Sequence, residues 1–136
     1  WVMEQQADSF ARRYETMTIA SLRFHGLHKL TSRRTLDDIH QLDEVVRQRV
    51  ANHLWAYTDI DAGARACVAA LHADYTGHEA FFIVAPTTIF TADVSSAELA
   101  RQFYPAVPIV GNLSGNASFY DCTKAERLLK WRHEEP

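Results

Sequence analysis

The chain has 136 residues, of which 47% are hydrophobic and 11% aromatic, a composition that fits one globular domain and excludes a disordered chain. Its 14 Lys and Arg residues are outnumbered by 17 Asp and Glu, giving a net charge of −3, which argues against a nucleic-acid partner because such proteins usually carry a basic excess. No apolar run approaches the about 18 residues that a membrane span needs. The two cysteines are too few for a disulfide framework and lack zinc-ligand spacing, so we expect a cytoplasmic chain without a metal site.

The chain opens with the pattern of an amphipathic helix. Met3, Ala7, Phe10 and Tyr14 recur at three- to four-residue spacing, with polar residues on the opposite side. No capping residue precedes them, so we expect the helix to begin upstream of Trp1. The first residue is Trp rather than Met, which suggests a part of a longer reading frame.

Two segments have the composition of buried strands. Residues 16–24 are rich in apolar and β-branched side chains, and residues 79–85 form a second apolar run that Pro86 ends. Contiguous apolar residues in both runs predict strands buried on both faces. Between the strands, residues 25–34 form a polar and basic loop, called the basic loop below.

Capping signals predict the remaining helices. Thr35 and Asp38 form a capping-box variant before an apolar stripe that we expect to run as one helix to Leu54. An aspartate, either Asp59 or Asp61, is expected to cap the next helix. Two further capping boxes begin at Ser95 and Thr123, and residues 111–118 between them are predicted as a loop.

Helices that alternate with buried strands indicate an α/β layer architecture. Two strands alone do not make a self-sufficient parallel sheet, since each needs neighbours on both edges. We therefore expect a partial Rossmann-like sheet whose N-terminal part, with most of the strands, is missing.

Three segments together resemble the C-terminal part of the NAD(P)-dependent epimerase/dehydratase family, the extended short-chain dehydrogenases. In the first, Glu4 matches the glutamate of the family's YxxSKxxxE catalytic helix, and Leu22 with Arg23 matches the Leu-Arg end of the strand that follows. In this alignment the catalytic Tyr-x-x-x-Lys pair falls upstream of Trp1.

The other two segments lie farther along the chain. Residues 57–67 are similar to the family's YVDVxDxARA stretch, with Ala62 where the second Asp is usual. Residues 121–131 are similar to the closing DxSKAxxxLGW signature, with Lys130 in place of Gly.

The resemblance implies an organisation and a cofactor. The whole chain, residues 1–136, would be the C-terminal portion of such a domain. Residues 1–25 would contain the tail of the catalytic helix and a late Rossmann strand, and residues 26–136 mainly a substrate-binding subdomain with one further strand. Intact relatives use NAD or NADP, which a Gly-rich loop at a helix N-terminus holds. None of the five glycines here forms such a loop, so we expect no cofactor for the isolated chain and no catalytic residue within it.

The resemblance also places candidate substrate contacts at the end of the first strand. Ligands of open α/β sheets bind beyond the carboxyl ends of strands, and the family's nicotinamide and substrate lie along this loop. Arg23, Phe24, His25, Gly26 and His28 are therefore the predicted substrate-binding residues, for a small-molecule substrate. Residues 105–120 contain no Arg or Lys, which disfavours a nucleotide-diphospho-sugar, because relatives clamp its diphosphate with an arginine there.

Other conspicuous residues receive plainer interpretations. Tyr120 and Lys124 repeat the Tyr-x-x-x-Lys spacing, which we interpret as coincidence because Thr123 is the expected helix N-cap and Tyr120 then precedes the helix. Cys67 is predicted as a small buried side chain, and Trp55 and Trp131 as core or interface anchors. Five histidines are predicted to be solvated, namely His40, His53, His72, His78 and His133.

The sequence thus predicts a fragment of an NAD(P)-dependent epimerase/dehydratase-like oxidoreductase that contributes the substrate-binding part and is inactive alone. The alternative is a non-catalytic interaction or dimerisation module. In that case the apolar stripe of the N-terminal helix would form a homodimer or cover a partner.

Overall fold

The computed structural model describes residues 1–29 and 31–133. Within these residues the chain is an α/β protein with six helices and two strands. In chain order they are α1 (Val2–Arg13), β1 (Thr18–Phe24), α2 (Leu36–His40), α3 (Glu44–Asn52), α4 (Ile60–Leu71), β2 (Gly77–Ile83), α5 (Ser96–Phe103) and α6 (Thr123–Leu129). No helix in this part of the chain is long and apolar enough to cross a membrane.

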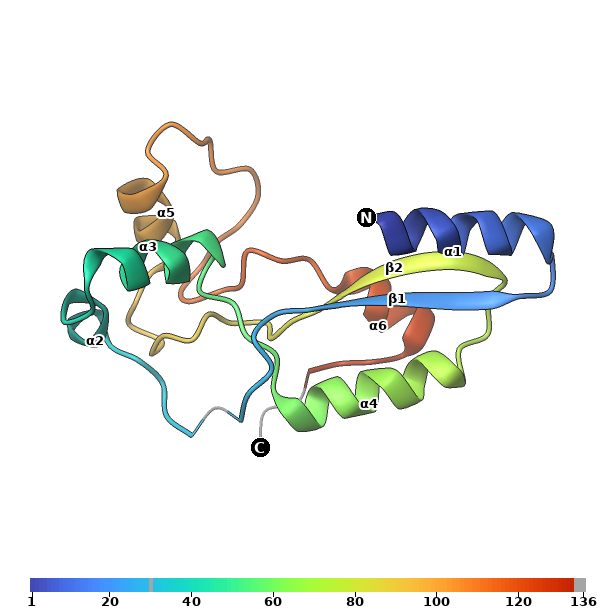
Figure 1. The fold of residues 1–136 in the computed structure, drawn as a ribbon. Coiled ribbons are helices and arrows are strands. Elements are labelled where there is room, and N and C mark those ends of the chain that lie inside the picture. The colour runs from blue at the N-terminus through green and yellow to red at the C-terminus, as the bar shows by residue number, and fades with distance from the viewer. Residues whose placement is uncertain (30, 134–136) are drawn as a thin grey trace.

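The two strands form a parallel sheet between layers of helices (Figure 1). Thr18 pairs with Gly77 and the register runs to Phe24 opposite Ile83, so both strands end at the same edge. Helix α1 packs on one face of the sheet, while α4 and α6 pack on the other. The parallel connection from β1 to β2 passes through α2, α3 and α4, as parallel pairing requires a long crossover.

The two faces of the sheet differ in polarity. Toward α4 and α6, the sheet contributes apolar side chains to a core that we call the sheet cluster, with Phe81, Ile83, Ala66 and Leu129 at its centre. The opposite face carries polar side chains toward α1. The expectation of strands buried on both faces was therefore wrong, because most residues of β1 and of β2 are only half-buried.

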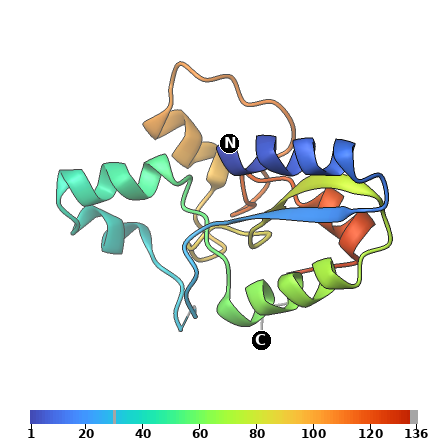
Figure 2. The same cartoon turned by 45° about the vertical axis from the view of Figure 1, so that its right-hand side comes forward.

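A second core is formed by side chains of α2, α3, α5 and the segments between them, and these three helices lie to one side of the sheet (Figure 2). This core surrounds the indole of Trp55, which is 1% exposed, and we call it the aromatic cluster. The rings of Phe90, Phe103, Tyr104 and Phe119 all lie within 6.4 Å of the Trp55 ring, centroid to centroid. Trp131, 4% exposed, anchors the sheet cluster, with its Nε1 donating to the Ala62 carbonyl at 3.0 Å. Both tryptophans are core residues, as predicted.

The single helix expected over residues 36–54 is wrong, because the chain breaks between α2 and α3. Asp43 takes an extended conformation there, and its carboxylate accepts a hydrogen bond from the Val46 amide at 2.9 Å. An N-cap of this kind satisfies one of the amides that a helix start leaves unpaired. The apolar stripe hid the boundary because it continues through both helices with little change of spacing.

The other caps agree with the sequence in three cases out of four. Thr35 forms a complete capping box with Asp38, Asp59 caps α4, and the Ser95 hydroxyl accepts from Glu98. The fourth, Thr123, is not the N-cap of α6, which begins after Cys122 without a side-chain cap. Asp121 instead accepts a hydrogen bond from the Thr123 amide at 2.8 Å.

Helix α4 buries a different face from the one expected. Ala62, Gly63 and Ala66 face the sheet cluster, and these small side chains bring the helix close to the strands. Cys67, by contrast, is exposed, so the prediction that it is buried was wrong. Leu71 on the same outer side is 85% exposed.

Candidate functional site

The carboxyl ends of the two strands are joined through one buried threonine. The Thr58 hydroxyl donates to the Ile83 carbonyl at 2.5 Å and accepts from the His25 amide at 3.2 Å. The Thr58 backbone also pairs with the start of the basic loop, because its amide donates to the Gly26 carbonyl and its carbonyl accepts from the His28 amide, both at 3.2 Å. This arrangement fixes the path of the chain just beyond β1.

Beyond this junction the basic loop forms one wall of a cleft of about 620 Å³, which we call the cationic cleft. The opposite wall comes from α2, α3 and the turn that follows α3. Its lining residues are Gly26, His28, Lys29, Thr31, Ser32, Arg33, Arg34, Asp38, Leu42, Val46, Arg49, Val50, His53, Trp55, Ala56 and Ile89. Four of these are Lys or Arg and one is acidic.

The predicted substrate-binding residues are distributed over different surroundings. Gly26 and His28 line the cationic cleft. Arg23 turns to α1, where it binds Glu4, and Phe24 packs against the sheet cluster. His25 lies between these regions, with its ring 4.4 Å from that of Tyr120.

Two basic residues of the cleft, Arg33 and Arg34, form hydrogen bonds to the segment that follows β2. The Arg33 guanidinium donates to the Thr88 carbonyl at 2.6 Å and lies over the Tyr57 ring at 5.3 Å. The Arg34 backbone pairs with the same segment, donating to the Ile89 carbonyl at 2.9 Å. Arg33 and Arg34 are therefore tied to the segment after β2.

His25 and Tyr120 form a partly buried pair at the strand ends. Burial lowers the pKa of His25 below its ordinary value, and the neighbouring His53 lowers it further, so the imidazole is neutral at pH 7. Burial likewise raises the pKa of Tyr120, which keeps the phenol protonated. The pair offers neutral hydrogen-bonding groups.

Lys124 does not approach the phenol of Tyr120. Its ammonium binds the Glu79 carboxylate at 2.6 Å and the Ala80 carbonyl at 3.3 Å, and Tyr120 precedes α6 rather than lying on it. The structure therefore supports the interpretation of this Tyr-x-x-x-Lys spacing as coincidence.

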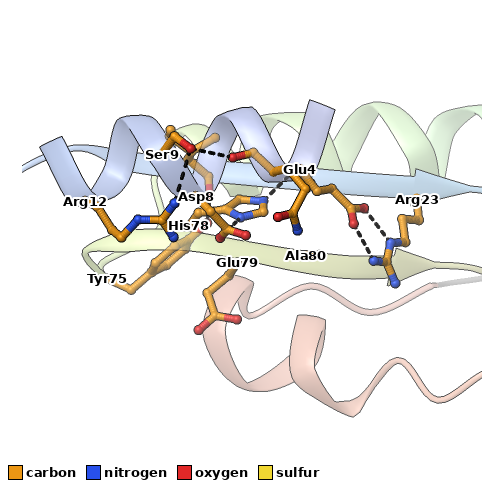
Figure 3. A network of polar contacts seen from close by, with 12 residues as sticks. Glu4, Asp8, Ser9, Arg12, Arg23, Tyr75, His78, Glu79 and Ala80 are labelled. Atoms are coloured by element: carbon orange, nitrogen blue, oxygen red, sulfur yellow. Dashed lines mark hydrogen bonds and ion pairs between the residues drawn. The ribbon is translucent and has the colours of Figure 1, made fainter. Parts of the chain in front are cut away.

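A polar network connects α1 to the sheet (Figure 3). His78 lies at its centre, with Nδ1 2.7 Å from the Asp8 carboxylate and Nε2 2.8 Å from the Ser21 hydroxyl. Its side chain is only 6% exposed, so the prediction of a solvated His78 was wrong. Ser21, His78 and Asp8 follow the order of a Ser-His-Asp triad. None of these three residues lines the cationic cleft. The network instead takes the place of apolar packing between α1 and the sheet.

His133 is also less solvated than predicted. Its ring is half-buried and Nε2 accepts a hydrogen bond from the Asp59 amide at 3.3 Å. His40, His53 and His72 are exposed, as expected.

A bidentate ion pair joins the same helix to β1. Arg23 donates to the two Glu4 carboxylate oxygens at 2.7 and 2.6 Å. These hydrogen bonds lower the pKa of Glu4 below its ordinary value of 4.5. The tether is therefore fully present above pH 4.5 and is lost as the pH falls through the lower pKa of the folded state.

We expect an NMR titration of the Glu4 carboxyl carbon to give a midpoint below 4.5. In Arg23→Gln the midpoint should return to the ordinary value, because the guanidinium is the main cause of the shift. Arg12→Gln is the matched control, since Arg12 lies on α1 but bonds to Ser9. An unchanged midpoint in Arg23→Gln would contradict this assignment.

A smaller cleft of about 470 Å³ lies beyond β2 and is lined in part by Cys122, Tyr120 and Trp131. Burial raises the pKa of the Cys122 thiol, so the thiolate needed of a nucleophile is disfavoured. Among the residues that the structure describes, no group of three or more His, Cys, Asp or Glu side chains could hold a metal ion.

The α3 side of the cationic cleft has no signal in the sequence. The loop is visible as a basic segment, but Arg49 on α3 and His53 just after it belong to no motif. Only the fold places them around the same cleft as the loop.

Comparison with known proteins gives no match to a family model, to a curated protein or to a solved structure. The resemblance to the epimerase/dehydratase family therefore rests on the three motif segments, and its functional implications are proposals.

Proposed function

We propose that this chain is the substrate-binding part of an NAD(P)-dependent epimerase/dehydratase-like oxidoreductase. The observation that carries the proposal is the position of the cationic cleft, which the loop after β1 lines at the carboxyl end of the parallel sheet. Ligands of open α/β sheets bind at this edge. Gly26 and His28, two of the predicted substrate contacts, line the cleft itself.

One contact between motif positions and one backbone conformation support the family assignment. The Arg23–Glu4 ion pair joins the Leu-Arg strand end to the glutamate of the catalytic-helix pattern. Lys130, which replaces the glycine of the closing signature, has φ +56° and ψ +28° at the end of α6. Glycine adopts that left-handed conformation most readily, so the backbone at Lys130 has the form that the signature's glycine favours.

The sheet also supports the idea of a larger Rossmann-like sheet. β1 and β2 each have one strand neighbour among the described residues, which leaves one edge of each strand without a ladder partner. Parallel sheets are rarely this small. In the proposal, further strands and the dinucleotide site are supplied from outside residues 1–136. Both cysteines are free thiols, consistent with the cytoplasmic location that we propose.

In the proposed function, the role of this chain is to bind and orient the substrate. When NAD or NADP is bound by the rest of such an enzyme, it supplies the hydride chemistry. The neutral His25 and Tyr120 pair would offer hydrogen bonds at the strand ends, while Arg33 and Arg49 would hold charged groups in the cleft.

The coding sequence upstream of the Trp1 codon tests the proposal directly. We expect an in-frame Tyr-x-x-Ser-Lys immediately before it and a Gly-rich loop farther back. We also expect calorimetry to detect no NADH binding by residues 1–136 alone. An in-frame upstream sequence without the Tyr-Lys pair, or micromolar NADH binding by the isolated chain, would overturn the assignment.

A second candidate function is homodimerisation through α1. Met3 and Phe10 are 75% and 53% exposed, and Tyr14 is 45% exposed, whereas only Ala7 of this helix is buried. Sedimentation velocity tests this alternative. A dimer that Phe10→Glu dissociates and Val110→Glu preserves would support it, since Val110 is an exposed apolar residue outside α1. A wild-type monomer at every concentration would exclude it.

A further inference from the structure

We infer that the cationic cleft is a binding site for a small molecule that carries a phosphate or carboxylate group. This inference names the class of ligand for the same cleft as the proposed function. It rests on the proposed function only in the statement that this ligand is a substrate. Binding of the anion itself follows from the residues of the cleft.

The charge of the cleft is opposite to that of the protein. The chain carries a net charge of −3, yet Lys29, Arg33, Arg34 and Arg49 line the cleft with Asp38 as the single carboxylate. Lys29 also lies 3.7 Å from the carboxylate of Asp61, outside the cleft. The hydrogen bonds that Asp38 accepts from Thr35 keep it charged, so the lining has four positive charges against one negative charge. A concave surface of one sign concentrates ligands of the other sign, so an anion is the favoured occupant.

The basic side chains of the cleft differ in how many contacts restrain them. Arg33 is fixed by Thr87, Thr88 and the Tyr57 ring. Arg49 is exposed on the opposite wall, and its guanidinium has no ion-pair or hydrogen-bond partner in residues 1–29 and 31–133. Arginine forks bind phosphate and carboxylate oxygens bidentately. The cleft thus combines a rigid cation with one that is free to close on a ligand.

A buried donor without a partner lies in the same wall. Trp55 lines the cleft and is 1% exposed, yet no hydrogen-bond acceptor for its Nε1 is present in the described part of the chain. Buried indole N–H groups usually find an acceptor. Because Nε1 itself is buried, an oxygen bound in the cleft would become its acceptor only if the wall opened.

The backbone beside this indole is strained. Leu54 and Trp55 both have φ +52°, a left-handed conformation that is unfavourable for side chains of this size. The turn is held by hydrogen bonds from the Leu54 amide to Ala51 at 2.7 Å and from the Trp55 amide to Val50 at 3.2 Å. Strain of this kind is concentrated at ligand sites, and here it directs Trp55 into the wall between the cleft and the aromatic cluster.

The size of the cleft fits a small molecule. Its volume of about 620 Å³ lies within the roughly 300–1,000 Å³ of small-molecule sites. A nucleic acid would need an extended basic surface, which the acidic balance of this chain does not favour.

Isothermal titration calorimetry of the 136-residue chain with inorganic pyrophosphate and with citrate tests the inference. The two probes distinguish a phosphate from a carboxylate ligand. We expect at least one to bind with a 1:1 stoichiometry and to weaken as salt is raised, because part of the attraction is screened. Arg49→Gln should weaken binding about tenfold or more, and Arg49→Lys by less, because it keeps the charge without the fork.

Arg127→Gln is the matched control, since Arg127 is exposed on α6 and does not line the cleft. The inference would be overturned by absence of binding of both probes at low salt, or by equal losses in Arg49→Gln and Arg127→Gln. Its failure is distinguishable from failure of the proposed function. Anion binding without an upstream Tyr-x-x-Ser-Lys would confirm the anion site and contradict the enzyme assignment. An upstream Tyr-x-x-Ser-Lys without anion binding would support the enzyme assignment and contradict the anion site.

Discussion

Trp55→Ala is expected to lower the free energy of unfolding by about 3–5 kcal/mol, the range found when large aromatic side chains are removed from cores. The indole is 1% exposed and is surrounded by the rings of Phe90, Phe103, Tyr104 and Phe119. Its removal would leave a cavity in the centre of the aromatic cluster. A marginally stable domain has about 5–15 kcal/mol in total, so the loss would be a large fraction of its stability.

Urea denaturation followed by circular dichroism measures this change. Trp1→Ala is the matched control, because Trp1 is 87% exposed and its removal should change stability by less than about 0.5 kcal/mol. Trp55→Phe should fall between the two, since a benzyl ring refills part of the space. Equal midpoints for Trp55→Ala and Trp1→Ala would show that the aromatic cluster is not a core.

The features that the sequence predicted well are those with local causes. The Thr35 and Asp38 box, the Asp59 cap and the Ser95 cap depend on side chains within three residues of the amides they satisfy. The α/β class follows from apolar runs that alternate with helical patterns. Such signals are readable because no distant part of the chain has to be known.

The features that were missed depend on distant contacts. Cys67 shares a helical stripe with Val68 and Leu71, but α4 packs on the sheet through the smaller Ala62 and Ala66. His78 is polar in isolation, yet Asp8, 70 residues earlier in the chain, accepts its hydrogen bond under α1. Side-chain type alone does not reveal which face a helix buries, or whether a buried imidazole has a partner.

The candidate site shows the same division. The basic loop was visible as a run of charge, and the resemblance identified the strand end from which it starts. The opposite wall of the cleft, with Arg49, depends on where the fold places α3 relative to the loop. The buried Nε1 of Trp55 without a hydrogen-bond partner and the left-handed turn at Leu54 arise from packing and backbone conformation, which the sequence does not display. Three of the four basic residues of the cleft, Lys29, Arg33 and Arg34, were therefore visible in the sequence, whereas the position of Arg49 opposite them depends on the fold.

Thr58→Val is expected to lower the free energy of unfolding by about 2 kcal/mol or more, although it changes one hydroxyl to a methyl. Thr58 is fully buried, and its hydroxyl bonds both the Ile83 carbonyl and the His25 amide. Without it, two buried backbone groups lose a partner, and each such loss costs about 1–3 kcal/mol. Val and Thr are similar in volume, so packing changes contribute little, and the loss isolates the polar junction at the strand ends.

The same substitution should loosen the start of the basic loop more than the rest of the sheet. Hydrogen exchange at the His25 and His28 amides is expected to quicken by a larger factor than exchange at Phe81, in the centre of β2, because the loop amides depend on the Thr58 junction. Thr58→Ser keeps the hydroxyl and should retain the loop's protection, at a smaller cost for the lost methyl group. If Thr58→Val and Thr58→Ser quickened exchange equally, the hydroxyl would not be what holds the loop. If only Thr58→Val did so, the path of the chain into the cationic cleft would depend on this one side chain.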